Sequence, residues 1–229
     1  PLTIPNLSAW YDADDAGTIL STANAVTEWR DKSGNGVHLV QNSAALKPTT
    51  GTVTLNGKNT IFFDGTDQIE STVATRQGDN MTVFMVLTNL GTQTGTLYRQ
   101  SNNFGASIEQ RNPTDYAITN GAIVQSNVGT VNDRSYITCQ FNAASGFIRR
   151  NGTQIATGNA GATEFTDGIS LGGSGFAGNL TIAGHAEFLL YDRVLTTEEI
   201  DTIEAYLAQK WGLEGFAPRD IADLYQWYD

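Results

Sequence analysis

The sequence predicts an all-β domain, a sandwich or a barrel, and three observations support this fold class. Between residues 50 and 190, short runs rich in Val, Ile, Phe and Tyr alternate with Gly, Asn and Asp, which is typical of strands joined by turns. The chain has 24 glycines, and its apolar share of 40 % suits an ordinary globular core. Because no long helices separate the strand-like runs, a parallel βαβ architecture is not expected.

Two hairpins are the clearest strand elements. In "TVTLNGKNTIFF", Asn56-Gly57 suits a type I′ turn, so that residues 53–55 pair with residues 60–63. The same dipeptide, Asn151-Gly152, recurs in "GFIRRNGTQIAT". Further strands are expected at residues 81–88, 96–100, 104–111, 116–119, 136–142, 169–172 and 181–191.

One helix is expected in "TTEEIDTIEAYLAQKWG". Thr196 and Glu199 have the spacing of a capping box, and Gly212 can supply a left-handed exit. One apolar stripe at helical spacing consists of Ile200, Ile203, Leu207 and Trp211. We expect this stripe to pack on the sandwich as part of the core.

The chain ends on a near copy of its own beginning. "IPNLSAWYD" at residues 4–12 and "IADLYQWYD" at residues 221–229 share Ile, Leu and the triplet Trp-Tyr-Asp in register. We interpret residues 1–213 as one domain, and residues 214–229 as a linker plus the first strand of a second, truncated repeat. The alternative is a native closing strand that pairs with this domain or with a neighbouring copy.

Charge and cysteine content exclude several functions. The chain has 24 acidic and 13 basic side chains and a formal charge of −11, so its surface would repel phosphate backbones, and no nucleic acid partner is expected. Cys139 is the single cysteine, which rules out an internal disulfide, and its apolar surroundings predict a buried, inert thiol. No targeting segment or membrane-spanning run is visible.

Several motifs together resemble a known family. They are "EWRDKSGNGVHL", "FFDGTDQIES", "RRNGTQIATG" and "AEFLLYDRVLTTEEIDTIEAYLAQKWGL". In these motifs the chain is similar to the LamG-like jelly-roll domains of the concanavalin A-like lectin/glucanase superfamily. Its opening, "LSAWYDADDAGTI", looks like the first strand and loop of versions common in phage virion and bacterial surface proteins.

This resemblance implies a two-sheet antiparallel jelly-roll sandwich with one concave sheet and one short carboxyl-terminal helix. It also implies a virion, extracellular or cell-surface location. Because the superfamily contains hydrolases, lectins and inert domains, the resemblance does not fix the activity.

Catalytic motifs are largely missing. The superfamily's glycoside hydrolases use closely spaced acids, typically Glu-x-Asp-x-(x)-Glu, and no such run occurs here. A pair made of Glu109 and Glu187 remains the alternative for hydrolysis. His38 and His185 have no zinc spacing with each other or with the cysteine, and we expect both to be structural.

The loop "RDKSGNG" supports two interpretations. Asp31 and Asn35 can hydrogen-bond their own backbone, so a tight turn accounts for them. The alternative is a Ca²⁺ site, because carboxylate and amide oxygens are the donors that this ion prefers. Its ligands would be Asp12, Asp14, Asp15, Asp31 and Asn35.

A sugar site needs an aromatic ring for stacking and planar polar groups for the hydroxyls. Residues of both kinds lie on neighbouring mid-chain strands, where the resemblance places a concave sheet. The candidates are Tyr98, Arg99, Glu109, Arg111 and Tyr116. A solvated strand face accounts for them equally well.

These observations favour a non-catalytic binding or display module of a phage virion or bacterial surface protein. Its partner would be a glycan or a surface or virion protein, with neighbouring copies of the same domain as further partners. The alternatives are a glycoside hydrolase of the same superfamily and a purely structural decoration domain of a capsid or fibre.

Overall fold

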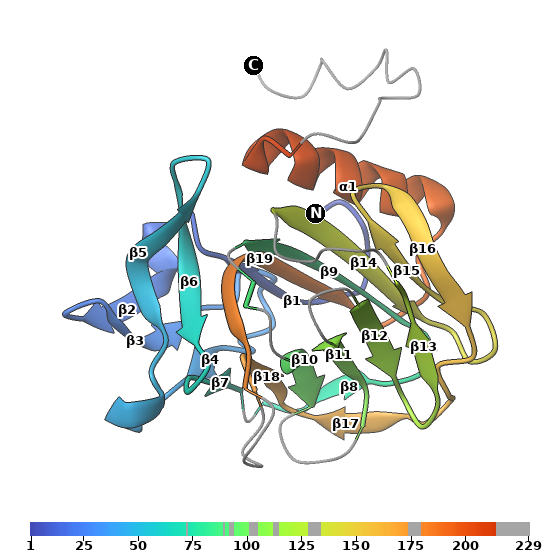
Figure 1. Ribbon diagram of the computed structural model, residues 1–229, viewed down its shortest axis with the longest axis horizontal. Coiled ribbons are helices and arrows are strands. Elements are labelled where there is room, and N and C mark those ends of the chain that lie inside the picture. Colours follow the sequence, from blue (N-terminus) through green and yellow to red (C-terminus); the bar gives the residue numbers. More distant parts are fainter. Residues whose placement is uncertain are drawn as a thin grey trace.

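Figure 1 shows the computed structural model, in which the described residues form a layered antiparallel β-structure with one α-helix. This confirms the predicted all-β sandwich with a single helix near the carboxyl end. The structure describes residues 1–71, 73–88, 90–91, 94–100, 105–111, 115–127, 134–173 and 180–213. The predicted linker and repeated strand at residues 214–229 lie outside the described residues.

The sheet next to the helix, here called the proximal sheet, is built around the longest strand. That strand, β19 (Ile182–Tyr191), pairs on one side with β9 (Met81–Thr88) and on the other with β1 (Leu7–Asp12). Beyond β9 follow β14 (Ser135–Phe141), β15 (Gly146–Arg150) and β16 (Thr153–Gly158). All these pairings are antiparallel.

The facing sheet, here called the distal sheet, consists of shorter strands. In spatial order they are β2 (Ile19–Thr22), β3 (Ala25–Trp29), β4 (Leu39–Val40), β7 (Ile69–Glu70), β18 (Ile169–Leu171), β10 (Gly95–Gln100), β11 (Ser107–Arg111), β12 (Asp115–Thr119) and β13 (Ile123–Gln125). The hairpin of β5 (Thr49–Leu55) and β6 (Lys58–Asp64) joins the two sheets, because β6 pairs with β19 and β5 with β3.

Three small elements complete the fold. A separate two-stranded ribbon pairs β8 (Thr75–Gln77) with β17 (Phe165–Asp167). The short 3₁₀ helices are η1 (Ala16–Thr18) and η2 (Ala44–Leu46).

Alternation along β9 explains how the layers stack. Met81, Val83, Met85 and Leu87 belong to the core between the two sheets, whereas Phe84 and Val86 belong to a second cluster under the helix. A strand that is covered on both faces has a nearly continuous apolar sequence, as "MTVFMVL" does. Cys139, opposite Val83 on β14, is fully buried, and this burial raises the pKa of its thiol, in agreement with the predicted inert cysteine.

Helix α1 (Thr197–Trp211) begins and ends as predicted. Thr196 and Glu199 form the capping box, and Gly212 is left-handed with φ 60°. Figure 1 shows the helix lying over the outer face of the proximal sheet. Its buried side chains on that side are Ile200, Ile203, Leu207 and Trp211. The described part of the chain has no helix with the length and hydropathy needed to cross a bilayer.

Both predicted hairpin turns are confirmed. Asn56 and Gly57 have φ 50° and 82°, and Asn151 and Gly152 have φ 48° and 78°, the left-handed angles that these turns require. The strand predicted at residues 104–111 begins at Ser107, and residue 104 lies outside the described residues.

Candidate functional site

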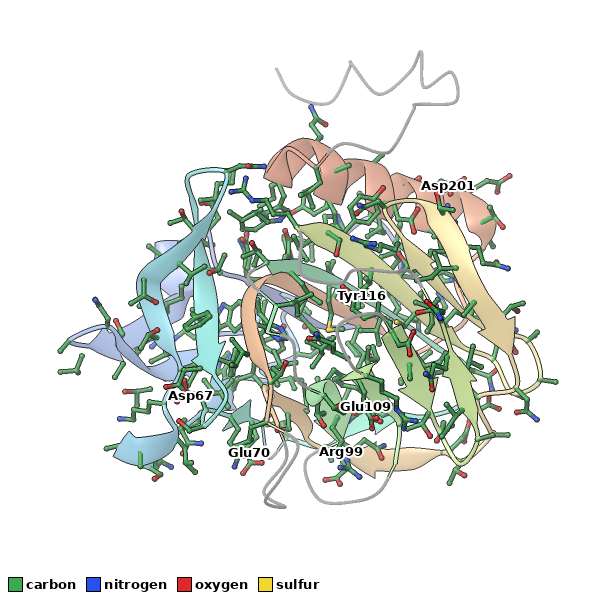
Figure 2. All side chains as sticks on the ribbon, in the orientation of Figure 1. Asp67, Glu70, Arg99, Glu109, Tyr116 and Asp201 are labelled. Atoms are coloured by element: carbon green, nitrogen blue, oxygen red, sulfur yellow. The ribbon has the colours of Figure 1, made fainter. Side chains whose placement is uncertain are left out.

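The predicted sugar-stacking rings lie inside the sandwich. Tyr98 and Tyr116 are both 0 % exposed and belong to the core between the sheets, and Figure 2 labels Tyr116. A bulge in the pairing of β10 with β11 accompanies the inward turn of Tyr98, whose hydroxyl donates to Gln77 Oε1. This corrects the expected role of both tyrosines, because neither ring is presented to a ligand.

The charged members of that predicted site do lie on the outer face of the distal sheet. Arg111 Nη2 is 3.0 Å from Glu109 Oε2, and Ser107 donates to Glu109 Oε1 at 2.9 Å. Arg99 is half-buried on the neighbouring strand (Figure 2). With both rings inside the sandwich, this face presents a paired acid and base.

The loop residues proposed as calcium ligands form a turn. Asp31 Oδ1 accepts the backbone amides of Trp10 and Ser33, and its Oδ2 accepts the amide of Val37. Asn35 donates its side-chain amide to Leu7 O at 2.8 Å. These bonds tie the loop to the start of β1, so the tight-turn interpretation describes both residues.

The other three proposed ligands bind ammonium groups. Asp12 contacts Lys210 at 2.7 Å and Lys32 at 2.9 Å, Asp15 also contacts Lys32, and Asp14 contacts a further lysine. Burial would raise the pKa of Asp12, but the two lysines outweigh it and hold the pKa below its ordinary value. Among the described residues, no group of three or more His, Cys, Asp or Glu could hold a metal ion.

A buried carboxylate links the first strand to the helix. Glu187 is 0 % exposed, and its Oε1 accepts from Trp10 Nε1 and the Tyr206 hydroxyl, both at 2.8 Å. Its Oε2 accepts from Trp211 Nε1 at 2.6 Å and from Lys210 Nζ at 2.9 Å. The sequence interpretation assigned Trp211 to the core but missed this acceptor and its four donors.

The acid pair suggested for hydrolysis does not converge. Glu187 lies under the helix on the proximal sheet, while Glu109 lies on the outer face of the distal sheet, with the apolar core between them. A glycosidic bond must be flanked by its two carboxyl groups, so these two residues cannot act on the same bond.

The two histidines are structural, as expected. His38 Nδ1 accepts the backbone amide of Asp31 at 3.0 Å. His185 is fully buried with its ring edge-on to Phe63, and burial lowers its pKa to about 3, which keeps the imidazole neutral.

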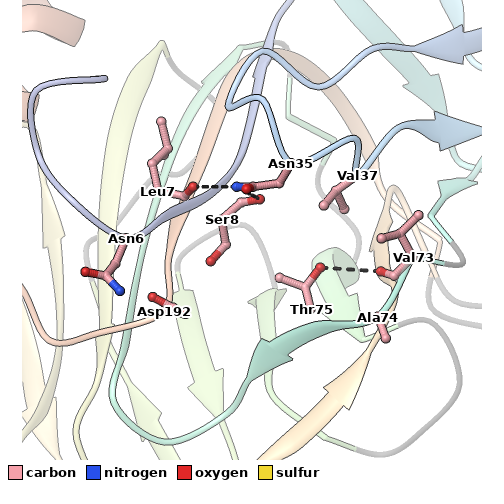
Figure 3. Close-up of a pocket in the computed structure, with 9 residues that line it drawn as sticks. All are labelled: Asn6, Leu7, Ser8, Asn35, Val37, Val73, Ala74, Thr75 and Asp192. Atoms are coloured by element: carbon pink, nitrogen blue, oxygen red, sulfur yellow. Dashed lines mark hydrogen bonds between the residues drawn. The ribbon is translucent and has the colours of Figure 1, made fainter.

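One end of the sandwich carries a hollow of about 430 Å³, here called the rim hollow (Figure 3). It lies between the start of β1, the calcium-candidate loop, the segment before β8 and the residue that follows β19. Its lining residues are Asn6, Leu7, Ser8, Asn35, Val37, Val73, Ala74, Thr75 and Asp192. In Figure 3, Asn6, Ser8 and Asp192 lie on one side, and Val37, Val73 and Thr75 lie on the other.

The rim hollow is rich in hydrogen-bonding groups. The side chains of Asn6 and Ser8 make no hydrogen bond within the part of the chain that the structure describes. Thr75 donates to Val73 O at 3.4 Å, which leaves its oxygen free to accept from a ligand. Asp192 is the single carboxylate among the nine lining residues. This set can hold a neutral polyol, but it lacks the second acid of a glycosidase.

Local sequence patterns offered only weak signals for these residues. Asn6 stands at a left-handed position with φ 66° just before β1, a conformation for which Asn is favoured. Asp192 lies next to Asn6 and Ser8 because β1 pairs with the end of β19. No local sequence pattern reveals this strand pairing.

Comparisons with known proteins identify the fold. No family model matches the chain, and no curated protein matches it in sequence. Among solved structures, a Trypanosoma rangeli sialidase in complex with sialic acid aligns with TM-score 0.64 and 14 % identity, over 91 % of this chain and 34 % of that chain. The botulinum neurotoxin serotype G binding domain aligns with TM-score 0.65 and 11 % identity, over 89 % and 51 %.

An arabinofuranosidase complexed with arabinofuranosyl-alpha-1,2-xylobiose aligns with TM-score 0.61 and 14 % identity, over 79 % of this chain and 50 % of that chain. The chain thus spans about a third to a half of the length of these structures. At such low identity the likeness concerns the fold alone: the chain is folded like the β-sandwich parts of glycosidases and toxin binding domains.

Proposed function

We propose that this chain is a non-catalytic glycan-binding module and that the rim hollow is its binding site. The observation that carries the proposal is the composition of the hollow: uncommitted amide and hydroxyl groups with a single carboxylate. Its volume of about 430 Å³ is within the range of small-ligand sites.

The chemistry of the lining suits a sugar. Asn6 can donate and accept at once, and Ser8 and Thr75 add hydroxyl groups, so vicinal sugar hydroxyls find both donors and acceptors. Val37 and Val73 supply an apolar wall for the C–H face of the ring. The structural neighbours support this class, since they include a sialidase bound to sialic acid and a toxin binding domain.

The test is a glycan array followed by calorimetry with the best array hit, using Asn6→Gly as the critical variant. Glycine tolerates the left-handed backbone at φ 66° and removes only the amide side chain. We expect affinity to fall about tenfold, the effect of one lost polar contact. Asn24→Gly is the matched control, because Asn24 has φ 68° in a turn outside the hollow.

Hydrolysis is the second candidate function, favoured by the glycosidases among the structural neighbours. It predicts release of reducing ends from the bound glycan, whereas the binding proposal predicts retention without turnover. A blank array would contradict both and favour the structural decoration domain.

The location of the module is proposed from the sequence resemblance alone. We propose display on a phage virion or a bacterial surface, and the structural neighbours add no support for the phage setting. We also propose that residues 221–229 repeat the first strand for a structural reason. In β1, Trp10, Tyr11 and Asp12 each contact a residue far away in the sequence, so a second copy of this strand would need the same triplet.

A further inference from the structure

A second hollow, of about 290 Å³, lies on the outer face of the proximal sheet where helix α1 leaves it uncovered. This hollow, here called the helix-side cleft, has the strands β14, β15 and β16 on one side and the start of α1 on the other. Phe147 lies opposite Gln140, and Arg149 lies opposite Gln154, in antiparallel register. Directly paired residues point to the same face, so these four side chains share one surface.

The helix-side cleft combines an aromatic ring with unused polar groups. Phe147 is partly exposed, and Leu195 and Ile200 form an apolar wall beside it. Gln140 is 5 % exposed, and its amide nitrogen is held by Leu195 O at 3.1 Å and by a threonine hydroxyl. Its carbonyl oxygen, like the side chain of Gln154, has no hydrogen-bond partner among the described residues.

The guanidinium that lines the cleft is paired with two acidic side chains of the helix. Arg149 donates to Gly152 O at 2.9 Å and contacts Asp201 at 3.0 Å and Glu204 at 2.9 Å (Figure 2 labels Asp201 on the helix). The two carboxylates beside the guanidinium would repel an anionic ligand. The guanidinium itself would repel a cationic ligand. An uncharged ligand with a flat apolar face and several hydroxyls meets neither penalty.

We propose that the helix-side cleft is a second glycan subsite, which binds an uncharged sugar ring stacked on Phe147 and hydrogen-bonded to Gln140 and Gln154. This inference rests on the proposed function and extends it from a single sugar to an oligosaccharide. Asp192 lines the rim hollow, and Thr197, five residues further along the chain, lines the cleft. Because five residues of extended chain span at most about 18 Å, the two residues lie no further apart than that, and one oligosaccharide can reach both subsites.

The experiment measures affinity by calorimetry for a disaccharide, a tetrasaccharide and a hexasaccharide of the cello-, xylo- and malto- series. For the intact chain we expect affinity to rise with length in the series that binds. Phe147→Leu keeps apolar volume but removes the aromatic face, and it should lower hexasaccharide affinity about tenfold while leaving disaccharide affinity within about twofold.

Gln154→Ala keeps the proposal falsifiable if the Phe147 variant folds poorly, because Gln154 is exposed. It should also weaken hexasaccharide binding, whereas Thr153→Ala, on the same strand but outside the cleft, should not. Affinity that is independent of length, or unchanged in both cleft variants, would overturn the subsite while the rim hollow stands. Absence of binding to all three series would overturn the subsite for neutral sugars, whereas the rim hollow is overturned by a blank glycan array.

Discussion

Two buried carboxylates between helix α1 and the proximal sheet, Glu187 on β19 and Glu204 on the helix, have very different partners. Both are 0 % exposed. Glu187 accepts two indole N–H groups, a hydroxyl and an ammonium. Glu204 Oε1 accepts from Thr138 at 2.6 Å, while its Oε2 has Arg149 at 2.9 Å as an ion pair without hydrogen-bond alignment.

The difference shows that the hydrogen-bonding partners of a buried acid, and not its burial alone, decide how the acid affects stability. Desolvation raises the pKa of Glu204 to about 7, because Thr138 and Arg149 only partly offset the loss of water. Glu187 instead joins β1, β19 and the end of α1 through aligned donors on every side. We therefore expect Glu187 to stabilise the helix contact and Glu204 to make it sensitive to pH.

The largest expected effect is that of Glu187→Gln. An amide cannot accept from all four donors, and Lys210 keeps only Asp12 as its acid partner, so we expect a loss of about 3–5 kcal/mol in the free energy of unfolding. Urea unfolding curves measure it. Glu109→Gln is the control, because its partly exposed ion pair with Arg111 is worth less than about 1 kcal/mol. Equal losses of unfolding free energy in the two variants would contradict the stabilising role assigned to Glu187.

An intermediate effect is expected from Glu204 as the pH changes. Its folded pKa of about 7 lies above the ordinary 4.5, so between these values the folded state binds the proton and the unfolded state does not. Stability should therefore fall as pH rises from about 4.5 to about 7, by on the order of 2–3 kcal/mol, and then level off.

Glu204→Gln should remove this slope when unfolding is measured near pH 5 and near pH 8. Burial also raises the pKa of Asp67, to about 6, but Asp67 is present in both proteins and its contribution cancels in the comparison. A variant with an unchanged slope would show that Glu204 is ionised throughout this range.

The smallest expected effect concerns the cap of the helix. Thr196→Ala removes the hydroxyl that accepts the Glu199 amide and should cost about 1 kcal/mol of unfolding free energy. Thr202→Ala is the matched control, since Thr202 donates only to a carbonyl one turn back within the helix, and it should change stability by less than about 0.5 kcal/mol. A cap effect as large as that of Glu187 would mean that the first turn, and not the buried acid, holds the helix.

Local patterns predicted the elements whose signals are local. The helix bounds followed from Thr196, Glu199 and Gly212, and both hairpins followed from their Asn-Gly turns. The two-residue strands β4 and β7 were not predicted, because so short a strand carries no alternation. The burial of Tyr98 was missed because the prediction placed Tyr98 and Arg99 in one site, although adjacent residues of a strand point to opposite faces.

By itself, the sequence determined a β-sandwich without an internal disulfide and with a capped helix, since turn chemistry, alternation and capping act over a few residues. The tertiary structure decided which polar groups meet. Trp10 and Glu187 are 177 residues apart, and Asn6 reaches Asp192 only through the pairing of β1 with β19. Such contacts depend on which strands become neighbours, and strand order is a property of the whole folded chain.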